Sequence, residues 1–137
     1  MRLNYFVCGE YALLDQIKNK ITIVGITDTI QSQQFPAIMP NFAFVIGVSR
    51  NPDEPEEVEG TTTFKIGEEI IVQGPSSVHF QGSLRSRIIT NIPGLVIPSP
   101  GLIVARLNLG DLIGEWSIDA EQVAPAAFQQ ILPLNLG

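Results

Sequence analysis

LIVARLNLGDLIGEWSI, residues 102–118, decides the fold class of the C-terminal part of this chain. Two alternating segments flank Gly110 and Asp111, and a Gly-Asp pair in that position is typical of a two-residue hairpin turn. The register that follows predicts these pairs: Leu109 with Leu112, Leu107 with Gly114, Ala105 with Trp116, Ile103 with Ile118, Asn108 with Ile113, Arg106 with Glu115, and Val104 with Ser117. One face is then apolar, and the two charges lie opposite each other on the other face. The stretch predicts antiparallel sheet with one side on a core.

The remaining chain repeats this pattern of short apolar segments between glycine and proline turns. Strands are predicted over 3–7, with a continuation over 11–14 past a kink at Gly9, and over 20–30 as a hairpin partner of the first strand. A crossover loop over 31–41 leads to a central strand over 42–48, and further strands are predicted over 61–66, 69–73, 76–80 and 84–92. A short helix is expected from Pro125 to about Leu132. The whole pattern predicts an all-β, two-layer antiparallel β-sandwich.

The composition is that of one small globular domain. The chain has 137 residues, 45% of them hydrophobic, and a formal net charge of −6. This length suits a single β-sandwich domain over 1–137. The eight lysines and arginines are scattered singly, whereas nucleic acids and anionic membranes require a clustered basic surface. No apolar run approaches the roughly 20 residues of a membrane span. We expect neither a nucleic acid nor a membrane as partner.

Cys8 is the only cysteine, so the chain cannot form an internal disulfide. This fits a reducing compartment, and we expect a cytoplasmic protein. The N-terminal MRLNYFVCGEY lacks the long apolar stretch of an export signal. A single cysteine and a single histidine cannot build a structural zinc site. We therefore expect Cys8 to be a small buried hydrophobe.

The N-terminal motifs resemble those of a known group of proteins. Cys8, the pair Tyr11-Ala12, Asp15, the run KITIVGI over 20–26 and the pair Phe35-Pro36 are similar to an uncharacterised family of small bacterial all-β proteins. Pro100-Gly101, followed by the terminal hairpin, is also typical of that family. The resemblance implies a sandwich fold and a bacterial origin. It implies no activity and supplies no catalytic or binding residues.

The acidic loop SRNPDEPEEVEG, residues 49–60, offers hard oxygen ligands of the kind that Ca²⁺ requires. Its weak candidate ligands are Asp53, Glu54, Glu56, Glu57 and Glu59. Calcium loops usually intersperse Asp and Asn with Gly, whereas this run has two prolines and long Glu side chains. We favour a solvated loop, and a small-ligand or calcium-binding sandwich is the alternative function.

His79 is the only histidine, so a nucleophilic mechanism would have to use it. Ser76 and Ser77 are too close along the same segment to form a triad with it, and no catalytic signature is present. We therefore expect no enzymatic activity and no cofactor. Arg85 and Arg87 share a strand face that could clamp a carboxylate or a phosphate, although a solvated face is the favoured interpretation.

Two apolar segments give the strongest functional prediction. IPGLVIPSPGL, residues 92–102, is unusually apolar for a loop, and the C-terminal ILPLNLG is equally apolar. The predicted interaction surface consists of Leu95, Val96, Ile97, Leu132, Leu134 and Leu136. The leading hypothesis is a non-catalytic interaction or structural module that contacts a protein partner, or a second copy of itself, through these segments or an exposed strand edge.

Overall fold

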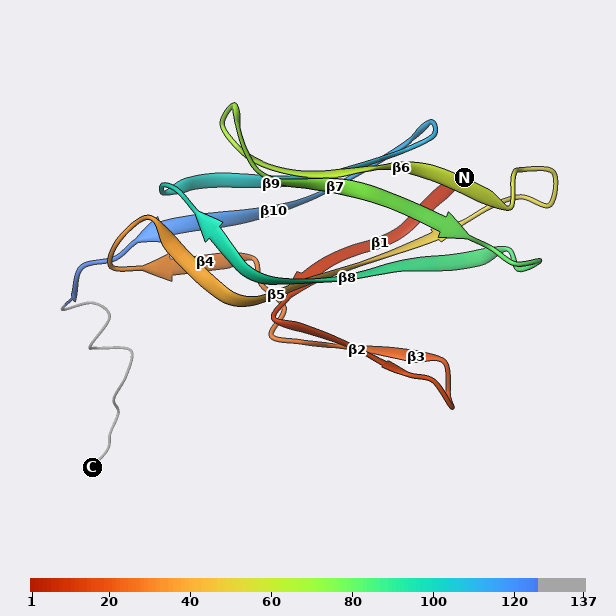
Figure 1. The fold of residues 1–137 in the computed structure, drawn as a ribbon, viewed down its shortest axis with the longest axis horizontal. Helices are drawn as coiled ribbons and strands as arrows, with labels where there is room; N and C mark the ends of the chain where they lie inside the picture. Colours follow the sequence, from red (N-terminus) through yellow and green to blue (C-terminus); the bar gives the residue numbers. More distant parts are fainter. Residues whose placement is uncertain (126–137) are drawn as a thin grey trace.

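Alternating apolar residues and frequent turns build ten strands in the computed structural model, which describes residues 1–125 (Figure 1). The strands are β1 (Arg2–Gly9), β2 (Tyr11–Asp15), β3 (Lys20–Val24), β4 (Thr29–Ser32), β5 (Ala37–Ser49), β6 (Glu57–Ile66), β7 (Glu69–His79), β8 (Arg85–Ile97), β9 (Gly101–Leu109) and β10 (Leu112–Gln122). The predicted all-β sandwich of packed antiparallel sheets is confirmed. The predicted helix from Pro125 to Leu132 lies outside the described residues except for Pro125 itself.

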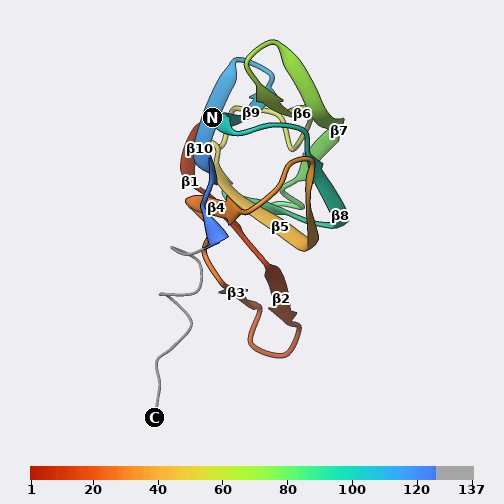
Figure 2. The same ribbon diagram turned by 90° about the vertical axis from the view of Figure 1, so that its left-hand side faces the viewer.

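Two sheets form the body of the molecule. The five-stranded sheet has the order β4-β10-β9-β6-β7, and the three-stranded sheet has the order β1-β5-β8. Pairing is antiparallel within both, except that β4 runs parallel to β10. The two sheets enclose the core between them. At one pair of edges β1 contacts β10, and at the other β7 contacts β8, as the view along the long axis shows (Figure 2).

The core is built from the inward-facing residues of both sheets. On β5 the alternation in FAFVIGV sends Phe42, Phe44, Ile46 and Val48 inward, and all four are buried. The ring of Phe64 on β6 meets that of Phe42 edge-to-face at 5.5 Å between centroids, a favoured aromatic geometry. The predicted central strand over 42–48 is therefore confirmed as the middle strand of its sheet.

The terminal hairpin has the predicted register throughout. β9 and β10 pair antiparallel, with Leu109 opposite Leu112 and Ile103 opposite Ile118. Arg106 Nη1 lies 3.7 Å from Glu115 Oε2 across the two strands. A two-residue turn fixes the register of a hairpin locally, and Gly110 has the positive φ of 60° that such a turn requires.

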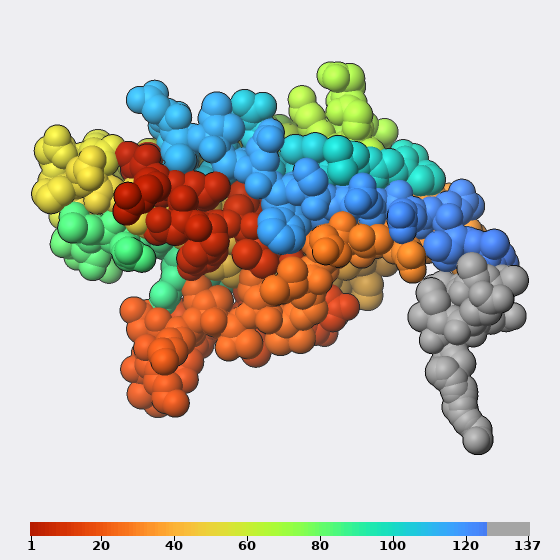
Figure 3. Space-filling model, turned by 180° about the vertical axis from the view of Figure 1, so that it is seen from behind, coloured from red at the N-terminus to blue at the C-terminus, as the bar shows by residue number. Residues whose placement is uncertain are grey.

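The predicted strand over 20–30 was wrong in its extent. Residues 20–30 divide into β3 and β4, because Gly25 turns the chain with φ of 67°. β3 pairs with β2, the predicted continuation of the first strand, so the hairpin is confirmed for residues 20–24. β4 joins the opposite sheet beside β10. The β2–β3 hairpin folds under the three-stranded sheet, and Figure 3 shows it projecting from the body of the molecule.

This hairpin covers part of the outer face of the three-stranded sheet. Ala12 of β2 packs on Ala43 and Val45 of β5, which are 0% and 1% exposed. Ile21 and Ile23 of β3, together with Ile89 of β8, complete this second apolar cluster. The sandwich therefore has a third, partial layer on one side only.

The predicted apolar loop over 92–102 is instead mainly strand. β8 continues to Ile97 through Pro93, and a proline is tolerated there because β8 is an edge strand. Leu95 and Ile97 are 3% and 0% exposed and belong to the core, so they cannot form an interaction surface. The predicted strands over 69–73 and 76–80 likewise merge into edge strand β7, which accommodates Pro75.

Candidate functional site

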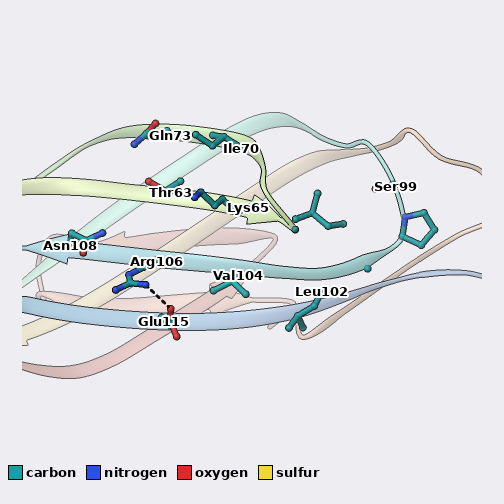
Figure 4. Close-up of a pocket in the computed structure, with 14 residues that line it drawn as sticks. Thr63, Lys65, Ile70, Gln73, Ser99, Leu102, Val104, Arg106, Asn108 and Glu115 are labelled. Atoms are coloured by element: carbon teal, nitrogen blue, oxygen red, sulfur yellow. Dashed lines mark ion pairs between the residues drawn. The ribbon is translucent and has the colours of Figure 1, made fainter.

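A groove of about 950 Å³ lies on the outer face of the five-stranded sheet (Figure 4). Its floor is made by strands β6, β7, β9 and β10, and the β8–β9 turn closes one end with Ser99 and Pro100. The turns β6–β7 and β9–β10 both rise on the side of the sheet that faces away from the core (Figure 1). The sheet thus forms a trough with raised corners.

The strand registers arrange the groove residues in rows across the sheet. One row is polar: Gln73 pairs with Thr63, Thr63 with Arg106, and Arg106 with Glu115. Residues of one row lie on one face because neighbouring paired side chains point the same way. This row offers hydrogen-bond donors and acceptors along its whole length.

The next row is amphipathic. Ile70 pairs with Lys65, and Lys65 pairs with Val104. Leu102 lies two residues before Val104 on β9, so it extends the same face toward the β8–β9 turn. Ile70 and Leu102 are 49% and 51% exposed, which leaves their apolar surface open to a ligand. The groove has an apolar end and a polar end.

The charge of the groove is weakly positive. Arg106 is balanced by Glu115 at 3.7 Å. Lys65 makes no ion pair with any of residues 1–125. In a chain of net charge −6, this lysine supplies the groove with one cation able to pair with an acidic ligand group. The lining residues of the groove are polar, charged and aliphatic side chains, which offer hydrogen bonds, the cation of Lys65 and apolar contact to a ligand.

The acidic loop is organised around a buried arginine. Arg50 is 9% exposed, and its Nε donates to the carbonyl of Ser83 at 3.0 Å. Its Nη1 donates to the carbonyl of Glu54 at 3.0 Å, and its Nη2 lies 3.3 Å from Glu56 Oε1. The guanidinium also lies over the ring of Phe80, 5.3 Å from its centroid, within cation–π range.

Glu54 and Glu57, two further candidate calcium ligands, also contact separate partners. Glu54 binds the N-terminal ammonium group and accepts from the backbone N–H of Asn51, and these contacts lower its pKa. Glu57 Oε1 lies 3.4 Å from His79 Nδ1. Within residues 1–125, no three His, Cys, Asp or Glu side chains gather as a metal site would require. The structure thus does not bring Asp53, Glu54, Glu56, Glu57 and Glu59 together.

Of the predicted interaction residues that the structure describes, one is exposed and two are buried. Val96 is 47% exposed and faces outward beside Ile38, its partner on β5. Leu95 and Ile97 face the core, as described above. Leu132, Leu134 and Leu136 lie outside the described residues.

Sequence reasoning missed the groove. The alternating polar residues of TTTFK over 61–65 and of ARLN over 105–108 indicate two solvent-facing strand faces. Their convergence depends on the pairing of β6 with β9, which joins Thr63 to Arg106 across 42 intervening residues. A local pattern cannot supply that register.

Residues 4–119 match the model of a family of unknown function (DUF6941). The chain belongs to this family. The match includes every strand residue that lines the groove, so the groove lies within the part of the chain that defines membership. No curated protein and no solved structure matches the chain. Within residues 1–125 there is no helix with the length and apolar character needed to cross a membrane.

Proposed function

We propose that this DUF6941 protein is a non-catalytic binding module that holds an extended segment of a protein partner in the groove of the five-stranded sheet. The groove of about 950 Å³ is the observation that carries the proposal. No family function or relative of known activity bears on this assignment, so its support is the shape and chemistry of the groove.

The dimensions of the groove suit a short extended peptide. The outward-facing residues of β9 run from Leu102 to Asn108, and at about 3.4 Å per residue this is roughly 20 Å. The four strands of the floor, at about 4.8 Å spacing, add a width of roughly 14 Å. A peptide of about six residues has the matching length.

The chemistry of the lining suits a segment with one apolar and one acidic side chain. Ile70 and Leu102 offer exposed apolar surface at the end near the β8–β9 turn. Lys65 lies between Ile70 and Val104 in the same row and can pair with a carboxylate. Thr63 and Gln73 of the polar row can donate hydrogen bonds to the peptide backbone and accept hydrogen bonds from it.

The proposal is tested by selecting binders from a library of displayed random 12-residue peptides on the immobilised full-length chain. Selected peptides are then synthesised, and their affinities are measured by fluorescence anisotropy. Thr63→Tyr fills the centre of the groove, and we expect it to weaken binding at least tenfold. The matched control is Ile113→Tyr. Ile113 lies on β10, on the outer face of the same sheet but outside the groove lining, so this variant should keep the affinity within about twofold.

Two results would overturn the proposal. One is a selection that yields no peptide enriched over an unrelated protein. The other is a set of peptides that bind Thr63→Tyr as tightly as the natural chain, because the occupied surface then lies elsewhere. Self-association is checked by sedimentation at several concentrations, with a loss of dimer in Thr63→Tyr pointing to a second copy as occupant.

Two further expectations accompany this proposal. A cytoplasmic location is favoured by the single unpaired cysteine, Cys8. A bacterial origin is implied by the N-terminal motifs.

A further inference from the structure

A second concavity, independent of the groove, lies between the β2–β3 hairpin and the outer face of the three-stranded sheet. This cleft has a volume of about 660 Å³. Arg85 and Arg87 of β8 form one side of it, and Leu14 and Asn19 of the hairpin form the other. Tyr5 of β1 lies over Gly47 of β5 on its floor, so closely that a Cβ on Gly47 would approach Tyr5 Cε2 to 2.3 Å.

The hairpin holds one of the two arginines in place. Arg87 Nη1 donates to the backbone carbonyl of Asn19 at 3.2 Å, and Arg87 Nη2 donates to Asn19 Oδ1. A guanidinium has five N–H donors, so these two bonds fix the group and leave three donors for a ligand. Asn19 accepts both bonds from a left-handed backbone conformation, with φ of 55°.

The second edge of the cleft has the same unusual backbone. Among residues 1–125, only Asn19 and Gln81 combine a side chain with positive φ, and both line this cleft. Left-handed conformations are unfavourable for most residues with a Cβ, whereas asparagine adopts them more readily, and those of other residues concentrate at functional sites. Gln81, at this second edge, has a φ of 52°, a backbone conformation that glycine would adopt with less steric strain.

The charge of the cleft is uncompensated within the described part of the chain. Arg85 and Arg87 are two residues apart on one strand face, so their Cα atoms are about 7 Å apart. Neither makes an ion pair within residues 1–125, and no carboxylate lines the cleft. The neighbouring carboxylates are engaged, since Glu57 pairs with His79 and Asp15 accepts from the backbone of its own turn.

We propose that this cleft is an oxyanion site that binds a small organic phosphate or carboxylate through Arg85 and Arg87. Arginine forks match the geometry of both groups and bind them in paired hydrogen bonds. The volume exceeds that of a bare inorganic ion, and the ring of Tyr5 offers a flat surface to the organic part of the ligand. Asn19 is a positioning residue that acts through Arg87.

Titration calorimetry of the full-length chain with phenyl phosphate and, separately, with benzoate tests this proposal. The experiment is run at low ionic strength, because salt screens such contacts. We expect one of the two probes to bind with a Kd below about 1 mM, and the tighter probe identifies the class of oxyanion. The Arg85→Gln/Arg87→Gln double variant should weaken that binding at least tenfold. Asn19→Gly, which keeps the backbone conformation, should weaken it about threefold.

The matched control is the Arg2→Gln/Lys18→Gln double variant. It makes the same change in net charge at two exposed residues that line neither the cleft nor the groove, and we expect the probe affinity to stay within about twofold. Equal loss in both double variants would mean non-specific attraction and would overturn the proposal. Failure of both probes to saturate would also overturn it. Because peptide binding is measured with Thr63→Tyr, failure of one site is distinguishable from failure of the other.

Discussion

The outer faces of the two sheets differ in how much of them is covered. Val45, on the middle strand of the three-stranded sheet, is 1% exposed because the β2–β3 hairpin packs on it. Val104, on the middle strand of the five-stranded sheet, faces outward and is half-buried on the groove floor. The chain thus covers one face with a local hairpin and leaves the other open, which antiparallel sheets permit.

This difference teaches how a small sandwich can carry a binding surface. Under the hairpin the three-stranded sheet presents the apolar residues Ala43 and Val45, whose burial removes apolar surface from water. In the five-stranded sheet β6 and β9 alternate outward polar side chains, such as Thr63 and Arg106, with apolar side chains that face the core. The side chains of each face therefore specify whether a third layer forms there.

The largest effect is expected from placing the same charge on both faces. Val45→Asp buries a carboxylate without a partner and should cost about 4 kcal/mol in the free energy of unfolding. Val104→Asp exposes its carboxylate to water and should cost at most about 1 kcal/mol. Urea denaturation followed by tryptophan fluorescence measures both. Equal costs would mean that the hairpin does not cover Val45 in solution.

An intermediate effect is expected at the contact between Tyr5 and Gly47. Gly47→Ala places a methyl group against the Tyr5 ring, and we expect a loss of about 1–2 kcal/mol from overpacking. In a Tyr5→Ala background the same substitution should cost almost nothing, since the clashing ring is gone. A double-mutant cycle of unfolding free energies gives the coupling. Additive costs would contradict the close approach of ring and strand.

The smallest effect is expected on the open face, at the ion pair of Arg106 and Glu115. Their side chains are 49% and 51% exposed, so a double-mutant cycle to Ala should give a coupling of only about 0.3–0.5 kcal/mol. The coupling should vanish in 1 M salt, where the Debye length falls to about 3 Å. A coupling above 1 kcal/mol would show that this face is shielded from solvent.

Local pairings were predictable from the sequence and distant ones were not. Gly110 and Asp111 fix the β9–β10 register within one turn, so every pair in that hairpin followed from the pattern. The strand over 20–30 was predicted too long because Gly25 divides it, and a glycine in an apolar run does not reveal a sharp turn. Pro75 and Pro93 led to the opposite error, because they predict the ends of strands that in fact continue through them. An edge strand tolerates a proline, which a central strand does not.

The candidate sites show the same limit. The shared face of Arg85 and Arg87 follows from their spacing alone, and the phosphate or carboxylate clamp was one interpretation of it. The contact of Arg87 with Asn19 joins residues 68 positions apart, and only the folded hairpin creates it. The groove depends in the same way on the pairing of Thr63 with Arg106.

Cys8 gives the natural chain its own reporter of opening. The thiol is fully buried on β1, and desolvation raises its pKa to about 12. At pH 8 only about one such thiol in ten thousand is ionised, so a thiol reagent reacts with Cys8 only after β1 has detached from its neighbours. When reclosing outpaces labelling, the rate of modification measures the free energy of that release. Labelling of Val45→Asp should then be faster than that of Val104→Asp.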